Sequence, residues 1–90
     1  MRFEWDAAKN ASNIAKRGVT FEIAKAIFDG PVLTFADNRR DTGEPRSNTI
    51  GKAGSVAILL VTHTDRQRVT RIISARPANR TERKRFDAEI

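Results

Sequence analysis

The chain has 90 residues and a formal net charge of +6, with no cysteine and one histidine. This length allows a single domain, residues 1–90, with one modest core. Without thiolates or a second histidine, neither a disulfide framework nor an ordinary zinc site can form, so we expect no metal and no other cofactor. The longest apolar run, residues 56–61, is too short to cross a bilayer, and no signal-peptide hydrophobic region follows Met1. Both observations predict a cytoplasmic protein without a membrane partner.

The positive charge is concentrated in the second half of the chain. Residues 1–38 carry five basic and five acidic side chains, whereas residues 39–90 carry twelve and six. Within residues 66–86, eight basic residues face a single acidic residue, Glu82. This distribution is typical of a protein that binds RNA, DNA or an acidic protein partner. A basic surface that serves solubility alone is the alternative.

The first elements are predicted from alternation and capping signals. Residues 2–5 alternate polar and aromatic side chains, which predicts a short strand that buries Phe3 and Trp5. Asp6 is a candidate N-cap for a helix over residues 7–17, and Gly18 is a typical stop signal. The predicted core face of this helix consists of its apolar positions, Ala7, Ala11, Ile14 and Ala15. The side chains predicted to face away are Lys9, Asn10, Asn13 and Arg17.

A second helix is predicted from Thr20 as N-cap to Gly30-Pro31, where the pattern ends. Its apolar face consists of Phe21, Ala24, Ile27 and Phe28. The polar loop over residues 37–44 has turn chemistry and mixed charge, which favours a functional role. Glycines at 51 and 54 predict a hairpin. The strands expected in this part of the chain cover residues 31–36, 45–52, 55–64 and 68–76.

The strand over residues 68–76 is the one around which the other elements are arranged. Strict alternation would place Ile72, Ser74 and Arg76 on one face, and Val69, Arg71, Ile73 and Ala75 on the other. Each face would then be part apolar and part cationic. Because a buried guanidinium needs a carboxylate, a phosphate or solvent, two arginines within six residues indicate a working surface. Arginines that extend to solvent at the sheet edge are the alternative.

Pro77 ends this strand, and residues 79–82 resemble a capping box for a helix that begins near Arg80. Arg80, Arg83 and Lys84 lie on one side of that helix, as either a binding face or a solvated charged face. With Lys16 and Arg17, they are the candidate nucleic-acid-binding residues. The predicted fold is therefore α+β, a small twisted and mostly antiparallel sheet. Two N-terminal helices pack on this sheet, and a C-terminal helix lies beside the last strand.

A metal-free ribonuclease must activate the 2′-hydroxyl, stabilise the charged phosphorane-like transition state and assist the leaving 5′-oxygen. Arg46, Arg71 and Arg76 are candidates for the second task, because guanidinium donors match phosphate oxygens in pairs. Glu44 or His63 would have to serve as base, since a two-histidine mechanism is excluded. Ser74 is also a candidate site residue, although a nucleophilic triad with His63 has little support. A structural histidine is the alternative for His63.

Several motifs together resemble one family over nearly the whole chain. They are Phe3-Glu4-Trp5-Asp6 with Lys9 and Asn13, Lys16-Arg17-Gly18 with Phe21, Gly43-Glu44 with Arg46 and Gly51, and Arg71-Ile72-Ile73-Ser74-Ala75-Arg76 with Ala78 and Glu82. In this order and spacing they resemble the BrnT toxins of bacterial type II toxin–antitoxin systems. The resemblance implies a RelE-like fold and a ribonuclease activity that cleaves RNA and arrests translation.

The same resemblance implies neutralisation by a BrnA-type antitoxin that carries a ribbon-helix-helix DNA-binding part. We expect two toxins and two antitoxins to form a heterotetramer, since that DNA-binding part dimerises. The chain departs from the family pattern at Arg17, where histidine is usual, and at Phe86, where tyrosine is common. Each departure removes a titratable group. A non-catalytic basic module that binds nucleic acid or protein is the alternative function.

Overall fold

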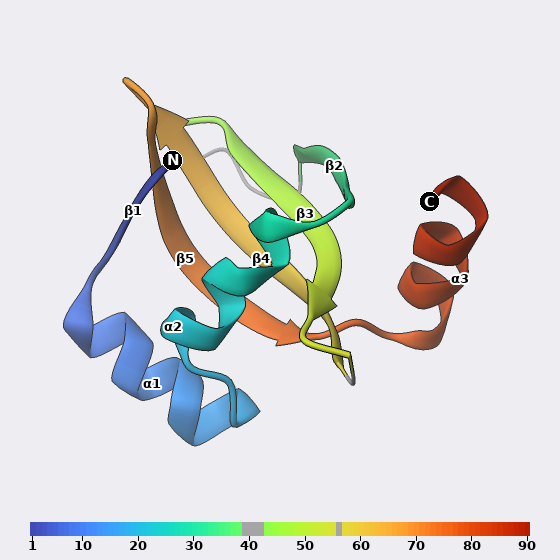
Figure 1. Cartoon of the computed structure of the whole chain (residues 1–90). Helices are drawn as coiled ribbons and strands as arrows, with labels where there is room; N and C mark the ends of the chain where they lie inside the picture. The colour runs from blue at the N-terminus through green and yellow to red at the C-terminus, as the bar shows by residue number, and fades with distance from the viewer. Residues whose placement is uncertain (39–42, 56) are drawn as a thin grey trace.

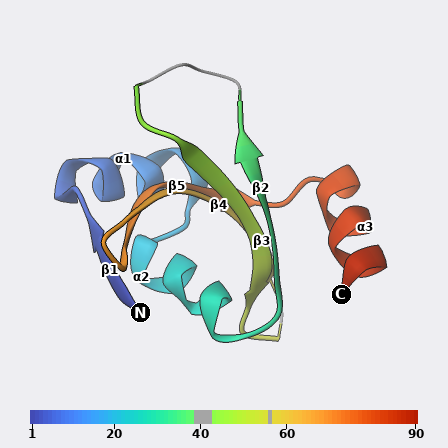
Figure 2. The same cartoon turned by 90° about the horizontal axis from the view of Figure 1, so that it is seen from above.

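The computed structural model describes residues 1–38, 43–55 and 57–90, in which a five-stranded sheet has helices on both faces (Figures 1 and 2). The strands are β1 (Arg2–Trp5), β2 (Val32–Asp37), β3 (Arg46–Ala53), β4 (Ala57–Arg66) and β5 (Val69–Pro77). The helices are α1 (Ala7–Arg17), α2 (Phe21–Ala24), the 3₁₀ helix η1 (Lys25–Asp29) and α3 (Arg80–Glu89). The α+β class and the bounds of the first helix are as predicted, whereas the predicted second helix is divided into α2 and η1.

The sheet is mixed, which corrects the prediction of a mostly antiparallel sheet. Its strand order is β1-β5-β4-β3-β2. The strands β2 to β5 form an antiparallel meander, but β1 runs parallel to β5, with Glu4 opposite Arg71. The parallel pairing was not predicted because it joins residues 2–5 with residues 69–72, and a contact between segments so far apart in the sequence leaves no local pattern.

The first helix begins and ends as its capping residues predict. The Asp6 carboxylate accepts hydrogen bonds from the backbone N–H groups of Ala8 (2.7 Å) and Lys9 (3.2 Å), and Gly18 ends the helix at φ +71°. The bonds from Lys9 and Ala8 lower the pKa of Asp6. Because the pKa is lowered on folding, this cap stabilises the protein above the unfolded pKa. Its contribution is lost as the pH falls through the folded value.

The inner face of α1 is polar, contrary to the prediction. Asn13 is the buried residue of this helix, while Ala7, Ala11, Ile14 and Ala15 are exposed. The Asn13 amide donates to the carbonyls of Val19 and Ala75, both at 2.8 Å, and its oxygen accepts the N–H of Ala75 at 3.1 Å. It therefore binds the part of β5 beyond the pairing with β1, as a neighbouring strand would. The spacing of the apolar residues predicted the wrong inner face, because the helix packs on the sheet through the Asn13 amide.

The main core lies between the sheet and the N-terminal helices. Phe21, Ala24 and Ile27 are fully buried there, as the predicted apolar face of the second helix requires. They pack against Val61 and Ile72 of the central strands. Phe3 and Trp5 of β1 are half-buried at the margin of this core, and the Trp5 and Phe21 rings meet edge to face.

The C-terminal helix packs over β2 and β3 on the opposite face, not beside the last strand as predicted (Figure 2). Phe86 is buried there in a second apolar cluster with Ile50 and Leu60. The predicted capping box is present, since Glu82 N–H donates to the Asn79 side chain and Asn79 N–H donates to Glu82. The docking position of α3 depends on a surface assembled from three strands, which the linear pattern does not show.

A β-bulge in β5 breaks the predicted alternation. Ser74 lies opposite Thr62, but Ile72 lies opposite His63, so Ile73 is an extra residue on β5. The bulge lets Ile72 and Ala75 both enter the main core. It also sets Arg71, Ser74 and Arg76 on the other face, the face that carries α3. The prediction that Arg71 and Arg76 point to opposite faces is therefore wrong.

Gly51 lies inside β3, as the predicted strand over residues 45–52 requires, at the point where η1 packs on the strand, and Gly54 lies in the turn of the predicted hairpin between β3 and β4. A Cβ atom at this position would lie 2.9 Å from Ile27 Cβ and 3.2 Å from the Ile27 carbonyl oxygen. Glycine is thus required for the close packing of η1 on the sheet.

We expect Asn13→Ala to lower the free energy of unfolding by about 2–4 kcal/mol, because three buried backbone groups lose their partner. Urea denaturation measures the effect. The control is Ser12→Ala, at an exposed position of the same helix, which should change stability by less than about 0.5 kcal/mol. Equal stability of the two variants would contradict the role assigned to Asn13.

Gly51→Ala should cost about 1–3 kcal/mol, since the added methyl group overpacks the contact with Ile27. Gly30→Ala is the matched control, because no atom lies within 4 Å of its Cβ position and its φ is −125°. Thermal melting of both variants tests the prediction. A Gly51→Ala protein as stable as Gly30→Ala would show that η1 can shift without cost.

Candidate functional site on the open sheet face

The face that carries α3 is covered only over part of its width, and polar side chains occupy the rest. One row crosses all five strands, since Glu4 pairs with Arg71, Arg71 with Thr64, and Arg46 with Asp37. Extending the β3–β4 register by one residue sets Arg46 opposite Thr64. Two strand spacings place the Cα atoms of Arg71 and Arg46 about 10 Å apart, within reach of one anion for two arginine side chains.

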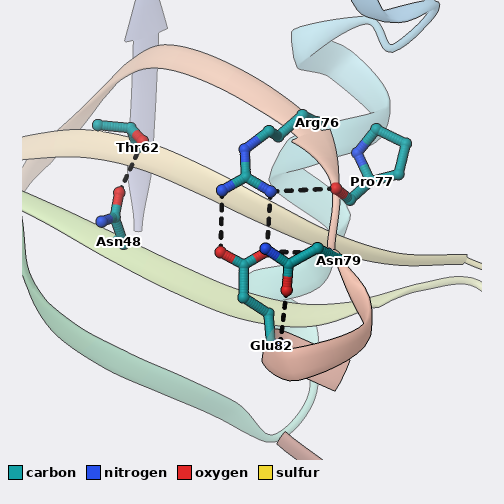
Figure 3. A network of polar contacts seen from close by, with 6 residues as sticks. All are labelled: Asn48, Thr62, Arg76, Pro77, Asn79 and Glu82. Carbon is teal, nitrogen blue, oxygen red and sulfur yellow. Dashed lines mark hydrogen bonds and ion pairs between the residues drawn. The ribbon is translucent and has the colours of Figure 1, made fainter. Parts of the chain in front are cut away.

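A second row lies next to the first, towards α3. It contains Ser74, Thr62, Asn48 and Phe35, in register from β5 to β2. The Thr62 hydroxyl donates to the Asn48 side-chain oxygen at 2.7 Å, and both side chains are buried (Figure 3). Ser74 is exposed. The two rows together form a polar surface, in which the arginine side chains extend further from the sheet than the short side chains between them. We call this surface the open face.

Arg76 lies at the end of the open face nearest α3. Its guanidinium donates two bonds to the Glu82 carboxylate, at 2.8 and 2.9 Å, and a third to the Pro77 carbonyl at 3.3 Å (Figure 3). Glu82 also accepts the Asn79 N–H, so the capping box of α3 holds the carboxylate that orients Arg76. The two side chains are partly buried. This bidentate geometry fixes the plane of the guanidinium.

Arg71 is more accessible than Arg76. It donates a 2.7 Å bond to Glu4 of β1, and about half of each side chain is exposed. An exposed pair of this kind adds little stability, so Arg71 can exchange its carboxylate for another anion at low cost. About four residue spacings along β5 separate Arg71 from Arg76, or about 13 Å.

A groove of about 400 Å³ adjoins Arg71 at the β4–β5 turn. Glu44 and Arg66 line it together with Arg71 and Thr64. The structure therefore brings Glu44, a predicted base, close to a predicted phosphate-binding arginine. Of the predicted functional loop, residues 39–42 lie outside the described residues.

His63 lies on the opposite face and is not brought together with these arginines. It is buried between Thr49, whose hydroxyl is 2.7 Å from Nε2, and Asp65, whose carboxylate is 3.1 Å from Nδ1. Its ring contacts Phe28 edge to face. Thr70 donates to the same Asp65 oxygen at 3.0 Å. This environment fits a structural histidine, the alternative kept for His63, and separates it from Ser74.

The predicted nucleic-acid-binding residues fall into two separate groups. Lys16 and Arg17 end α1 on the main-core side, whereas Arg80, Arg83 and Lys84 are exposed on α3 (Figure 2). Only the α3 group lies on the side of the sheet that carries the open face (Figure 2). Three residues of this face were not predicted. The Arg85 guanidinium lies 4.7 Å from the Phe35 ring centre at the margin of the face. Thr62 and Thr64 lie on the face because they alternate with His63 along β4, a pattern that is visible in the sequence.

No cluster of three or more His, Cys, Asp or Glu side chains suited to a metal ion occurs in residues 1–38, 43–55 and 57–90. Within the same ranges, no helix is long and apolar enough to span a membrane.

The mixed sheet, its N-terminal helices and the cationic face beside α3 define a small basic α+β protein with a partly uncovered sheet face. The crystal structure of the Brucella abortus ribonuclease toxin BrnT superposes with a TM-score of 0.70, at 24% identity, over 89% of this chain and 99% of that one. Residues 5–82 match the family model of the BrnT ribonuclease toxins of type II toxin–antitoxin systems. The chain therefore belongs to the BrnT family. No curated protein sequence gives a significant match.

Proposed function

We propose that this ribonuclease toxin cleaves RNA on the open face, without a metal ion, and thereby arrests translation in the cytoplasm. The observation that carries the proposal is the β5 bulge, which sets Arg71, Ser74 and Arg76 on one face. Arg46 lies across the same face, on β3. A row of cations on a sheet gives an extended RNA backbone successive phosphate contacts.

In this proposal Arg71 and Arg46 bind the scissile phosphate, and Arg76 binds a neighbouring one. Arg71 releases Glu4 when the phosphate arrives, and its guanidinium stabilises the extra negative charge of the transition state. Glu44 takes the proton of the 2′-hydroxyl, which attacks phosphorus and leaves a 2′,3′-cyclic phosphate. The 5′-oxygen takes a proton from water. Ser74 and the α3 cations Arg80, Arg83 and Lys84 position the strand.

This mechanism predicts the effects of single substitutions on cleavage. Arg71→Ala should slow cleavage by on the order of 100-fold with little loss of RNA affinity, and Glu44→Gln should also be slow, because each removes a contact that acts in the transition state. A chelator should have no effect. Gel analysis of a labelled RNA measures the rate and detects the cyclic end. Fluorescence anisotropy measures the affinity.

Lys9→Ala is the control, because Lys9 is an exposed cation of α1 across the sheet. It removes the same charge and should leave the cleavage rate unchanged. A wild-type protein that binds RNA but never cleaves it, with or without ribosomes, would instead support the non-catalytic binding module.

A toxin of a type II system implies an antitoxin partner. We propose that it is a BrnA-type protein with a ribbon-helix-helix part, and that an acidic or amphipathic segment of it covers the open face. The positive charge of the toxin and the exposed Arg71 support this choice of surface.

Co-expression of the toxin with its antitoxin should yield a complex with two copies of each chain. Size-exclusion chromatography with light scattering measures its mass. The complex should weaken with added salt and should not cleave RNA, because the antitoxin occupies the arginines. Elution of the toxin as a free monomer in the presence of the antitoxin would contradict the proposal.

A further inference from the structure

The turn between β4 and β5 has an unfavourable backbone conformation. Arg66 pairs with Val69, so only Gln67 and Arg68 connect the strands. Their φ angles are +50° and +68°, and they are the only non-glycine residues with positive φ in the described ranges. A two-residue hairpin of this hand normally uses Asn-Gly or a similar pair, because L side chains are disfavoured at positive φ. The protein thus keeps two long side chains where glycine would fit better.

The two side chains of this turn line different hollows on opposite faces. Gln67 lines the groove that also contains Arg71, Glu44 and Thr64. Arg68 lines a separate hollow with Phe28 and Thr34, on the His63 side of the sheet. Backbone strain at a functional site is retained when it places a side chain that the reaction needs. Of the two strained residues, only Gln67 has its side chain in the groove that contains Arg71.

We propose that Gln67 reads the base beside the scissile phosphate and selects adenine, an inference that rests on the proposed function of the open face. A primary amide presents a donor and an acceptor side by side, and this pair matches the N6 amino group and N7 on the Hoogsteen edge of adenine. On the same edge guanine presents two acceptors and each pyrimidine a single polar group. Single-stranded RNA exposes these base edges to proteins. Gln67 and Arg71 line the same groove, so a nucleotide whose phosphate binds Arg71 would have its base within reach of the Gln67 amide. Its volume of about 400 Å³ lies in the range of small-ligand sites.

The test uses an unstructured RNA that contains all sixteen dinucleotide steps, with the cleavage rate measured at every step. Wild-type protein should prefer adenine at one flank of the cleaved bond by roughly 5- to 150-fold, the discrimination expected of one bidentate base contact. Gln67→Gly should lose this preference. It should also raise the Tm by several degrees, since glycine relieves the strain at φ +50°.

Arg68→Gly is the matched control, because it relieves the neighbouring strained position in the same turn. It should raise the Tm similarly and keep the adenine preference. Opposite effects of Gln67→Gly on stability and on selectivity exclude simple unfolding as the cause.

Three results would overturn the inference. Wild-type cleavage without an adenine preference, or a Gln67→Gly protein that keeps the preference, would remove Gln67 as the reader and leave the proposed function intact. A wild-type protein that cleaves none of the sixteen steps would overturn both.

Discussion

The open face depends on one extra residue in β5. Without the bulge at Ile73, side chains would alternate strictly, and the face that receives Ile72 could not also receive Ala75. The bulge satisfies two demands within one strand, since the core needs both apolar residues and the open face needs both arginines. A β-bulge that redirects a side chain beside a functional surface is a common use of this irregularity.

The helices on the two sides of the sheet have different roles. On one side, the Asn13 amide attaches α1 to β5, and η1 packs closely on Gly51 of β3. The apolar side chains of β4 and β5 on this side therefore lie in a closed core. On the other side, α3 covers the apolar end of the sheet, and the exposed side chains of the polar rows, such as Arg71 and Ser74, lie beyond it. The same helix supplies Glu82, which orients Arg76. The rigid side therefore supports the strands whose outer face is proposed to bind RNA.

Two arginines of the open face, Arg71 and Arg76, are paired with carboxylates. Glu4 and Glu82 compensate charges that would otherwise repel one another across a small sheet. The two pairs differ in their geometry and exposure. The single bond between Arg71 and Glu4 at an exposed position is easily exchanged, whereas the bidentate pair of Arg76 and Glu82 is built into the cap of a helix. This difference suits Arg71 for the transition state and Arg76 for a fixed phosphate contact.

Local signals in the sequence determined the elements themselves. Asp6 and Gly18 defined the first helix, the Asn79 and Glu82 capping box defined the last, and β-branched runs defined the strands. These signals act between residues a few positions apart, so they can be read along the chain. The family motifs likewise identified the protein class before any contact was known.

Contacts between residues far apart in the sequence became known only from the tertiary structure. The parallel pairing of β1 with β5, the inward position of Asn13 and the docking of α3 over β2 and β3 all depend on such contacts. The candidate site shows the same division. The arginines were recognised from their residue type, but the register and the bulge decided that Arg71 and Arg76 share a face and that His63 does not. Side-chain direction in a strand depends on every residue being paired, and one unpaired residue reverses it for all that follow.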